Sequence, residues 1–305
     1  YFTPLPNESI ETGRPMKKTP IYNKLKESGA IYLDSYGWEK PCWFAKKGMK
    51  EEYGFKRTNA FPHVQKECEN IFLSNWICIG RASELSSVGK FITINVKDEN
   101  IIVLCDDEGQ LRAFYNVCRH RGTQICNKEI GEFSKTIQCG YHGWTFNLHG
   151  DLIGAPHMEA VDGFEKKNYP LHEVALSEWE GFIFINLSEN PVDFYLEYQS
   201  IISRFLEWGI RDLETIETIN YEVNCNWKLI IQNYSECYHC PFIHPNLADI
   251  TPYTGGMNDL VSGEILGGYM EIKSASITHD GQLCAPTLGT LSGEKLNRVY
   301  YYSLF

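Results

Sequence analysis

The strings CRHRG, which begins at residue 118, and CGYHGW, which begins at residue 139, decide how the middle of this chain folds. Cys118 and His120 form a CxH pair, Cys139 and His142 form a CxxH pair, and 18 residues separate the two pairs. Each of two short loops would therefore supply one thiolate and one imidazole. Two cysteines can hold one iron of a [2Fe-2S] cluster while two histidines hold the other. We expect these four side chains to be the cluster ligands.

A structural zinc site is the alternative, because Cys2His2 sets also bind zinc tetrahedrally. Zinc fingers usually group their cysteines together and their histidines together, whereas each loop here mixes one of each. The glycines favour the cluster, since Gly122, Gly140 and Gly143 would let the loops bend close to its sulfur atoms and direct N–H groups at them. We expect His149, His157 and His172 to be ordinary surface or turn residues.

The two strings closely resemble the Rieske family. Rieske proteins of respiratory complexes carry an extra cysteine in each loop, but here Cys126 lies too far along the chain to match one. The resemblance is therefore to the branch that contains oxygenases and ferredoxins.

A second motif, NWKLIIQNYSECYHCPFIH, spans residues 226–244. Glu236 and His239 are three residues apart on a predicted helix and would share one face, and His244 follows a break at Pro241. Two histidines and one carboxylate form the facial triad of non-haem Fe(II) oxygenases. The motif supplies the two histidines, and Asn233 would either border the iron or face water.

This motif resembles the catalytic helix of Rieske oxygenase alpha subunits. The resemblance implies that His239 and His244 bind mononuclear Fe(II), and that Glu236 is a carboxylate bridging to a cluster histidine of a neighbouring subunit. The family more often has Asp there, and Glu is found in the branch that acts on choline, carnitine and betaine-type substrates. The third ligand of the family lies well downstream, so we expect it beyond Phe305. The nearer carboxylates are too close to His244 to match it: Asp249, Asp259, Glu264, Glu271 and Asp280.

Short apolar runs such as FITINV and IIVLC, separated by turns, predict an antiparallel β domain over residues 63–188. From residue 189 to 305 the pattern turns mainly helical and then strand-like, with helices predicted at 194–208 and 227–239 and a strand at 267–277. The resemblance implies an α+β fold, in which a Rieske domain precedes a helix-grip (START-like) catalytic domain. We expect that domain to be truncated, because the closing VYYYSLF looks like an interrupted strand.

Bulk composition narrows the class of partner. With 28 basic and 39 acidic side chains the net charge is -11, which argues against nucleic acid and anionic membrane surfaces as partners. No stretch approaches the roughly 18 apolar residues that span a bilayer, and no signal peptide is recognisable. The 11 cysteines are spread over the chain and are expected to be mostly reduced. We therefore expect a cytoplasmic protein.

The second motif looks most like glycine betaine monooxygenases, which hydroxylate an N-methyl group and release it as formaldehyde. Residues 10–62 resemble the linker region of dimethylglycine and sarcosine dehydrogenases, which implies that 1–62 is an appended extension and suggests fusion to an upstream flavin domain. The resemblance implies a separate flavin/iron-sulfur reductase, O2, a small methylamine substrate and a homotrimer. Aromatic side chains that could surround a cationic substrate lie near the motif: Tyr234, Tyr238, Phe242 and Tyr253. The alternatives are an aromatic-ring-hydroxylating dioxygenase alpha subunit and a Rieske electron carrier fused to an amine dehydrogenase.

Overall fold

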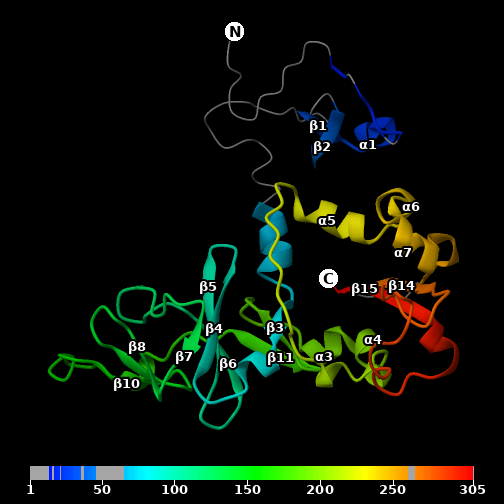
Figure 1. Cartoon of the computed structure of the whole chain (residues 1–305). Helices are drawn as coiled ribbons and strands as arrows, with labels where there is room; N and C mark the ends of the chain where they lie inside the picture. Colours follow the sequence, from blue (N-terminus) through cyan, green and yellow to red (C-terminus); the bar gives the residue numbers. More distant parts are fainter. Residues whose placement is uncertain are drawn as a thin grey trace. The chain divides into compact units, whose positions relative to one another are not determined.

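The structure is a computed structural model in which the chain forms two compact units, Tyr1–Ile71 and Phe72–Phe305 (Figure 1). Much of the expected extension, including all of residues 46–62, lies outside the described part of the chain. The described residues are 14–15, 17–20, 22–35, 38–45, 65–259 and 265–304.

The first unit is a helix followed by a β-hairpin. Helix α1 (Tyr22–Glu27) leads into the antiparallel strands β1 (Ala30–Ser35) and β2 (Trp38–Phe44). The rings of Tyr22 and Tyr32 pack with their centroids 4.4 Å apart, and both side chains are buried. Because a single hairpin is marginally stable in water, this aromatic contact between helix and strand adds to its stability.

The second unit is built on small antiparallel sheets, as the sequence predicts. One sheet has the order β6-β5-β4-β7, with β4 (Lys90–Val96), β5 (Glu99–Cys105), β6 (Leu111–Tyr115) and β7 (Ile130–Glu132). Another has the order β11-β12-β3, with β3 (Ile77–Arg81), β11 (Ala175–Trp179) and β12 (Phe182–Asn186). A third has the order β10-β9-β8, with β8 (Thr136–Gln138), β9 (Thr145–Asn147) and β10 (Leu152–Gly154).

Strand β5 is buried on both faces. Successive side chains of a strand point to opposite sides. Ile102 and Leu104 accordingly join a core that contains Cys118 and Cys139, whereas Ile101 and Val103 join a second core that contains Ile183 and Ile185 of β12. All four of the β5 side chains are fully buried, which explains why this strand reads as an uninterrupted apolar run.

Strand β12 repeats this alternation and produces a third core. Ile183 and Ile185 face β5, and Phe184 faces the opposite way towards Phe194 and Tyr198. The phenylalanine rings of residues 184 and 194 lie 4.6 Å apart. The sheet that contains β5 therefore packs on the sheet that contains β12. The other face of β12 packs on helices α3 (Phe194–Glu197) and α4 (Gln199–Ile202).

The remaining chain forms helices α5 to α7 and a three-stranded sheet of order β13-β14-β15 (yellow to red in Figure 1). None of the residues in these three helices is buried. Their bounds are α5 (Trp227–Tyr234), α6 (Cys240–Ile243) and α7 (Pro245–Ile250), and those of the strands are β13 (Met257–Asn258), β14 (Ile265–Glu271) and β15 (Arg298–Leu304).

Three predicted elements are shorter than expected. The helix predicted at 194–208 is broken into α3, α4 and a 3-10 turn at Leu206–Trp208, which Gly209 ends in a left-handed conformation. The helix predicted at 227–239 ends at Tyr234, and the strand predicted at 267–277 ends at Glu271. In each case the apolar pattern continues past the last backbone hydrogen bond of the element, so the pattern alone overestimates the length.

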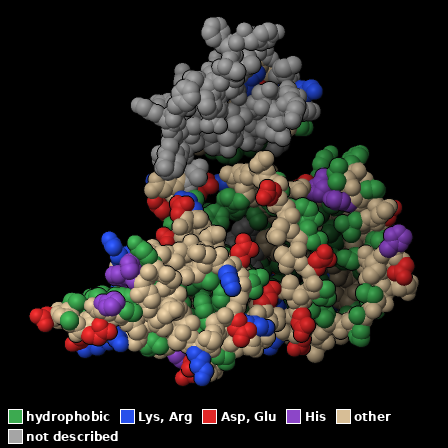
Figure 2. Space-filling model, turned by 60° about the vertical axis from the view of Figure 1, so that its left-hand side comes forward, with side chains coloured by type: hydrophobic (Ala, Val, Ile, Leu, Met, Phe, Trp, Pro, Cys, Tyr) green, Lys and Arg blue, Asp and Glu red, His purple; other side chains and the backbone are tan. Residues whose placement is uncertain are grey.

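The face drawn in Figure 2 carries charged side chains of both signs. On the described part of the face in Figure 2, Lys and Arg side chains lie scattered among Asp and Glu and form no continuous basic field. Across the helices that the structure describes, none combines the length and apolar character needed to cross a bilayer.

Candidate metal centres

The two loops that carry the predicted cluster ligands have matching backbones. In the first, the Cys118 N–H donates to the carbonyl of Thr123, and the Gly122 N–H donates back to Cys118. In the second, the Cys139 N–H donates to the Trp144 carbonyl at 2.8 Å, and the Gly143 N–H donates to the Cys139 carbonyl at 3.1 Å. Both glycines have φ near +70° (70° and 71°), a left-handed conformation that residues with a side chain rarely adopt.

The loops bring the four predicted ligands together as a sulfur pair and an imidazole pair. Cys118 and Cys139 are buried, whereas His120 is half-buried and His142 is exposed. The two imidazole Nδ1 atoms lie 3.1 Å apart. Burial raises the pKa of the Cys118 thiol, and the adjacent Cys139 thiol adds to the rise. The histidine side of the centre is therefore the side open to an electron-transfer partner.

The donor geometry fits a two-iron cluster better than one zinc ion. A single tetrahedral ion needs its donor atoms close together, but among the described residues no three of these four donor atoms lie within 4.8 Å of one another. A [2Fe-2S] cluster separates its thiolate and imidazole ligands, because each pair binds a different iron. Burial lowers the pKa of His120, and the nearby His142 and Arg121 lower it further, which favours the neutral ring that binds metal.

Two neighbours of the cluster loops are not apparent from the sequence. The ring of Trp144 stacks on His120 with centroids 4.9 Å apart and planes 10° from parallel. Arg119, between the first two ligands, donates to Nε2 of His172. Burial and the Arg119 charge lower the pKa of His172, so its neutral ring can accept this bond. His172 is exposed, as expected for a surface residue, and its contact with Arg119 links it to the first cluster loop.

The predicted iron-binding residues lie in a turn, not on a helix. Helix α5 ends at Tyr234, and Glu236 and His239 follow it. The helix stops here because Glu236 Oε2 accepts the Tyr238 backbone N–H at 2.6 Å, which offers the backbone a local alternative to helical bonding. The prediction that both residues share a helix face was therefore wrong. The turn nevertheless brings them together.

Glu236 orients His239 towards a possible metal ion. The Nδ1 atom of His239 lies 2.5 Å from Glu236 Oε1, so the Nε2 atom remains for metal binding. The His244 ring lies beyond α6, with its centroid 5.5 Å from that of His239. Asn233 Nδ2, beside the turn, lies 3.5 Å from Nδ1 of His239. The hydrogen bond from His239 lowers the pKa of Glu236 despite opposition from burial, which favours the carboxylate form.

Among the carboxylates near this turn, two are engaged elsewhere. Asp259 forms an ion pair with Arg204 and accepts a hydrogen bond from the Tyr302 hydroxyl at 3.2 Å. Asp280 closes a turn by accepting the Gln282 N–H at 3.0 Å. Neither bond involves His239 or His244.

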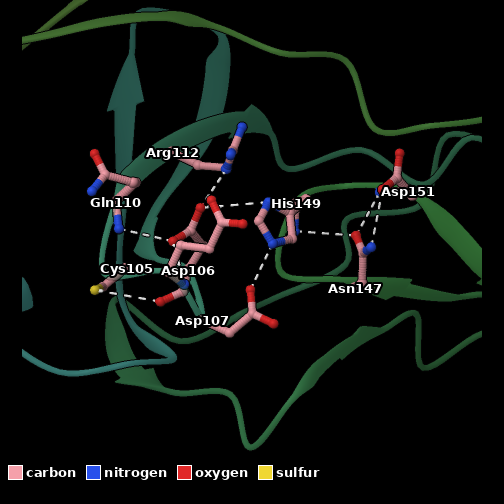
Figure 3. Close-up of polar contacts among 9 residues, drawn as sticks. Cys105, Asp106, Asp107, Gln110, Arg112, Asn147, His149 and Asp151 are labelled. Atoms are coloured by element: carbon pink, nitrogen blue, oxygen red, sulfur yellow. Dashed lines mark hydrogen bonds and ion pairs between the residues drawn. The ribbon is translucent and has the colours of Figure 1, made fainter.

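A separate polar cluster joins the turn after β5 to the turn after β9 (Figure 3). Asp106, Glu108 and His149 place one potential ligand atom each within 4.8 Å of one another. However, the fully buried Asp106 already receives Arg112 Nε at 2.6 Å, and His149 Nε2 lies 2.6 Å from Asp107. We interpret the cluster as a polar link between two hairpins, and His149 lies in a turn, as expected.

Comparison with known proteins finds two matching domains. The family model described as Rieske [2Fe-2S] domain matches residues 75–165, and the model described as ring hydroxylating alpha subunit (catalytic domain) matches residues 210–305. The carnitine monooxygenase oxygenase subunit of Acinetobacter baumannii is 37% identical over 197 residues, which cover 64% of this chain and 52% of the relative. The glycine betaine monooxygenase oxygenase subunit of Pseudomonas aeruginosa is 35% identical over 184 residues, 59% of this chain and 42% of the relative.

A solved structure shows the same fold. The quaternary ammonium Rieske monooxygenase CntA in complex with L-carnitine matches with a TM-score of 0.62 and 35% identity, covering 68% of this chain and 58% of that one. The chain spans about half the length of the curated relatives it matches. Its two matched domains imply a [2Fe-2S] cluster and a mononuclear iron, and the donor sets described above fit both. The chain therefore carries a Rieske [2Fe-2S] domain, followed by part of a catalytic domain of the ring hydroxylating alpha subunit type.

Proposed function

We propose that this chain forms the electron-transfer domain and part of the catalytic domain of an oxygenase that hydroxylates an N-methyl group of a small quaternary or tertiary methylamine, such as glycine betaine. The observation that carries the proposal is the turn in which Glu236 orients His239 beside His244, in a chain that also holds the Rieske loops. A pure electron carrier would not need this second centre.

The reaction balances as a monooxygenation. It consumes O2, two electrons and two protons, places one oxygen atom on the methyl carbon and releases the other as water. The resulting N–CH2OH group then eliminates formaldehyde and leaves an N–H. The bound iron would supply O2 activation, and a separate flavin/iron-sulfur reductase would supply the electrons.

The protein side chains have defined tasks in this proposal. Cys118 and Cys139 would hold one iron of the cluster, and the exposed His142 with His120 would hold the other and face the electron-transfer route. His239 and His244 would hold the mononuclear iron. A carboxylate oxygen can accept more than one hydrogen bond, so Glu236 could also receive one from a cluster histidine of a neighbouring subunit.

This bridging role favours a closed ring. If the cluster of one subunit serves the iron of the next, each contact joins two different surfaces, and such contacts close into cyclic oligomers. We propose a homotrimer with head-to-tail contacts, in which Glu236 lies at each junction.

The substrate assignment rests on charge and on relatives. The net charge of -11 suits a cationic substrate, and relatives named for carnitine and glycine betaine share 37% and 35% identity with this chain. A quaternary ammonium gains about 0.5 to 2 kcal/mol from an aromatic face. The rings near the turn are accessible, with exposed fractions between 41% and 83%: Tyr234, Tyr238, Phe242 and Tyr253.

A single-turnover experiment tests the proposal. The full protein, with its cluster chemically reduced and excess reductant removed, is mixed with O2 and glycine betaine or L-carnitine. Formaldehyde is the expected product from glycine betaine. Release of trimethylamine would instead place hydroxylation on the carbon chain, a cis-diol from naphthalene would indicate a ring dioxygenase, and cluster oxidation without any product would favour an electron carrier.

We also propose that residues 1–62 are an appended segment related to the linker of dimethylglycine and sarcosine dehydrogenases. Such a fusion would join enzymes that act on successive methylamines. The full-length reading frame tests this directly, because a flavin domain should precede Tyr1.

A further inference from the structure

Two free cysteines flank the predicted iron ligand His239. Cys237 and Cys240 form a Cys-x-x-Cys motif in the turn between α5 and α6, and both are half-buried. The iron-binding role proposed above uses neither thiol.

The turn holds the two cysteines close enough for a disulfide. The Cys240 N–H donates to the Cys237 carbonyl at 3.0 Å, a bond between residues i+3 and i. Such turns keep the outer Cα atoms within about 7 Å, and disulfides need a Cα separation of roughly 4.4 to 6.8 Å. The backbone is therefore already folded as a disulfide requires.

The two sulfur atoms have different surroundings. Cys237 Sγ packs 4.0 Å from Met270 Sδ on strand β14, which fixes it against the sheet. Cys240 Sγ lies 4.0 Å from Nε2 of His239, the nitrogen available to iron.

We propose that Cys237 and Cys240 form a reversible disulfide when hydrogen peroxide reaches this turn. Peroxide oxidises the Cys240 thiol to a sulfenic acid and releases one water. The Cys237 thiol then condenses with the sulfenic acid, an S–S bond forms and a second water leaves. In total two thiols and one peroxide give one disulfide and two waters.

The disulfide would alter the iron site, a consequence that rests on the function proposed above. The S–S bond would bring Cys240 Sγ, which now lies 4.0 Å from His239 Nε2, to about 2.05 Å from Cys237 Sγ. His239 lies between the two cysteines in sequence, so the turn that aligns its ring with Glu236 must readjust. Oxidation therefore loosens the mononuclear iron while the Rieske cluster, in another domain, is retained.

The experiment uses the full protein with both iron centres. It is exposed to an equimolar amount of hydrogen peroxide, and the peptide containing Cys237 and Cys240 is examined by mass spectrometry without reduction. The expected result is the loss of two hydrogens from that peptide, its recovery with dithiothreitol, and a loss of mononuclear iron with an unchanged Rieske EPR signal.

Matched variants separate the possible outcomes. Cys237→Ser and Cys240→Ser should each keep their iron under the same treatment relative to their own untreated samples, whereas Cys284→Ser, at an exposed cysteine elsewhere, should behave like the parent protein. Absence of the disulfide in the parent would overturn the inference, as would equal iron loss in all variants. A disulfide that forms in a protein that never binds mononuclear iron would instead contradict the proposed function.

Discussion

Oε1 of Glu236 lies 2.5 Å from Nδ1 of His239, while Oε2 of the same carboxylate accepts the Tyr238 N–H. Both carboxylate oxygens of Glu236 therefore have partners among the next three residues. Because Nδ1 of His239 faces the carboxylate, Nε2 is the imidazole nitrogen left for a metal ion. A carboxylate bound to a metal-ligating histidine orients the ring and raises its basicity. If His239 binds iron as proposed, this relationship leaves Nε2 as its ligand atom.

Glu236→Gln tests the bridging role. The amide keeps the shape but loses the charge, so the variant should retain its Rieske spectrum and bind iron, yet reoxidise its reduced cluster far more slowly with substrate and O2. Stopped-flow spectroscopy measures this rate. Glu236→Gln chains and Cys118→Ser chains can also be mixed in one ring. Such mixed rings should recover some activity. If rings shown to contain both variants stayed inactive, electrons would travel within one chain.

Cys118→Ser tests the cluster assignment. Loss of one thiolate ligand should abolish the Rieske EPR signal, because each cluster iron depends on two protein ligands. Cys126→Ser is the matched control, since Cys126 is also buried but lies outside the two ligand pairs. Its signal should be unchanged, and loss of the signal in the control would show that the ligand set is wrong.

His239→Ala tests the separation of the two centres. The intact protein should contain about three irons per chain, two in the cluster and one mononuclear. The variant should retain two irons and its EPR signal and lose turnover, whereas His279→Ala, at an exposed histidine, should match the parent. If the variant also lost the cluster signal, the division into two sites would fail.

Arg81 joins strand β3 to the start of the catalytic segment. Its buried guanidinium donates to the carbonyls of Ile210 and Leu213 at 3.0 and 2.5 Å. Arg81→Met leaves these acceptors unpaired, so we expect unfolding to become easier by about 2 to 4 kcal/mol in urea titrations. Arg211→Met, at an exposed arginine in the same segment, should change stability by less than about 0.5 kcal/mol.

The lowered pKa of Asp106 leads us to expect that the stability of the fold depends on pH. Burial alone would raise its pKa, but hydrogen bonds from Arg112 and from the Gln110 and Glu108 N–H groups outweigh burial and lower it. A carboxyl whose pKa is lowered on folding adds stability above its unfolded pKa, near 3.8, and that stability is lost as the pH falls further. Asp106→Asn should remove this part of the acid sensitivity and cost about 1 to 3 kcal/mol at neutral pH. Asp107→Asn, at an exposed carboxylate, should preserve the acid-dependent loss, and equal profiles for both variants would contradict the assignment.

The sequence by itself predicted the two domain types, the α+β class and the spacing of both ligand motifs. Cluster ligands must sit on short loops at fixed separations, so the Cys-x-His and Cys-x-x-His strings carry that information locally. The apolar runs of β4, β5 and β12 were equally readable, because short apolar runs bounded by turn residues are typical of buried strands.

Only the tertiary structure decided where the elements end and what supports the site. The sequence could not show that α5 stops before Glu236, since the competing bond from that side chain to the Tyr238 N–H depends on the folded turn. Nor could it show that Arg119 is held by His172, or that His149 joins two hairpins, because those partners lie 53 and 42 residues apart along the chain. Contacts between distant residues leave no local pattern, and they arise only when the strands that carry them pack together.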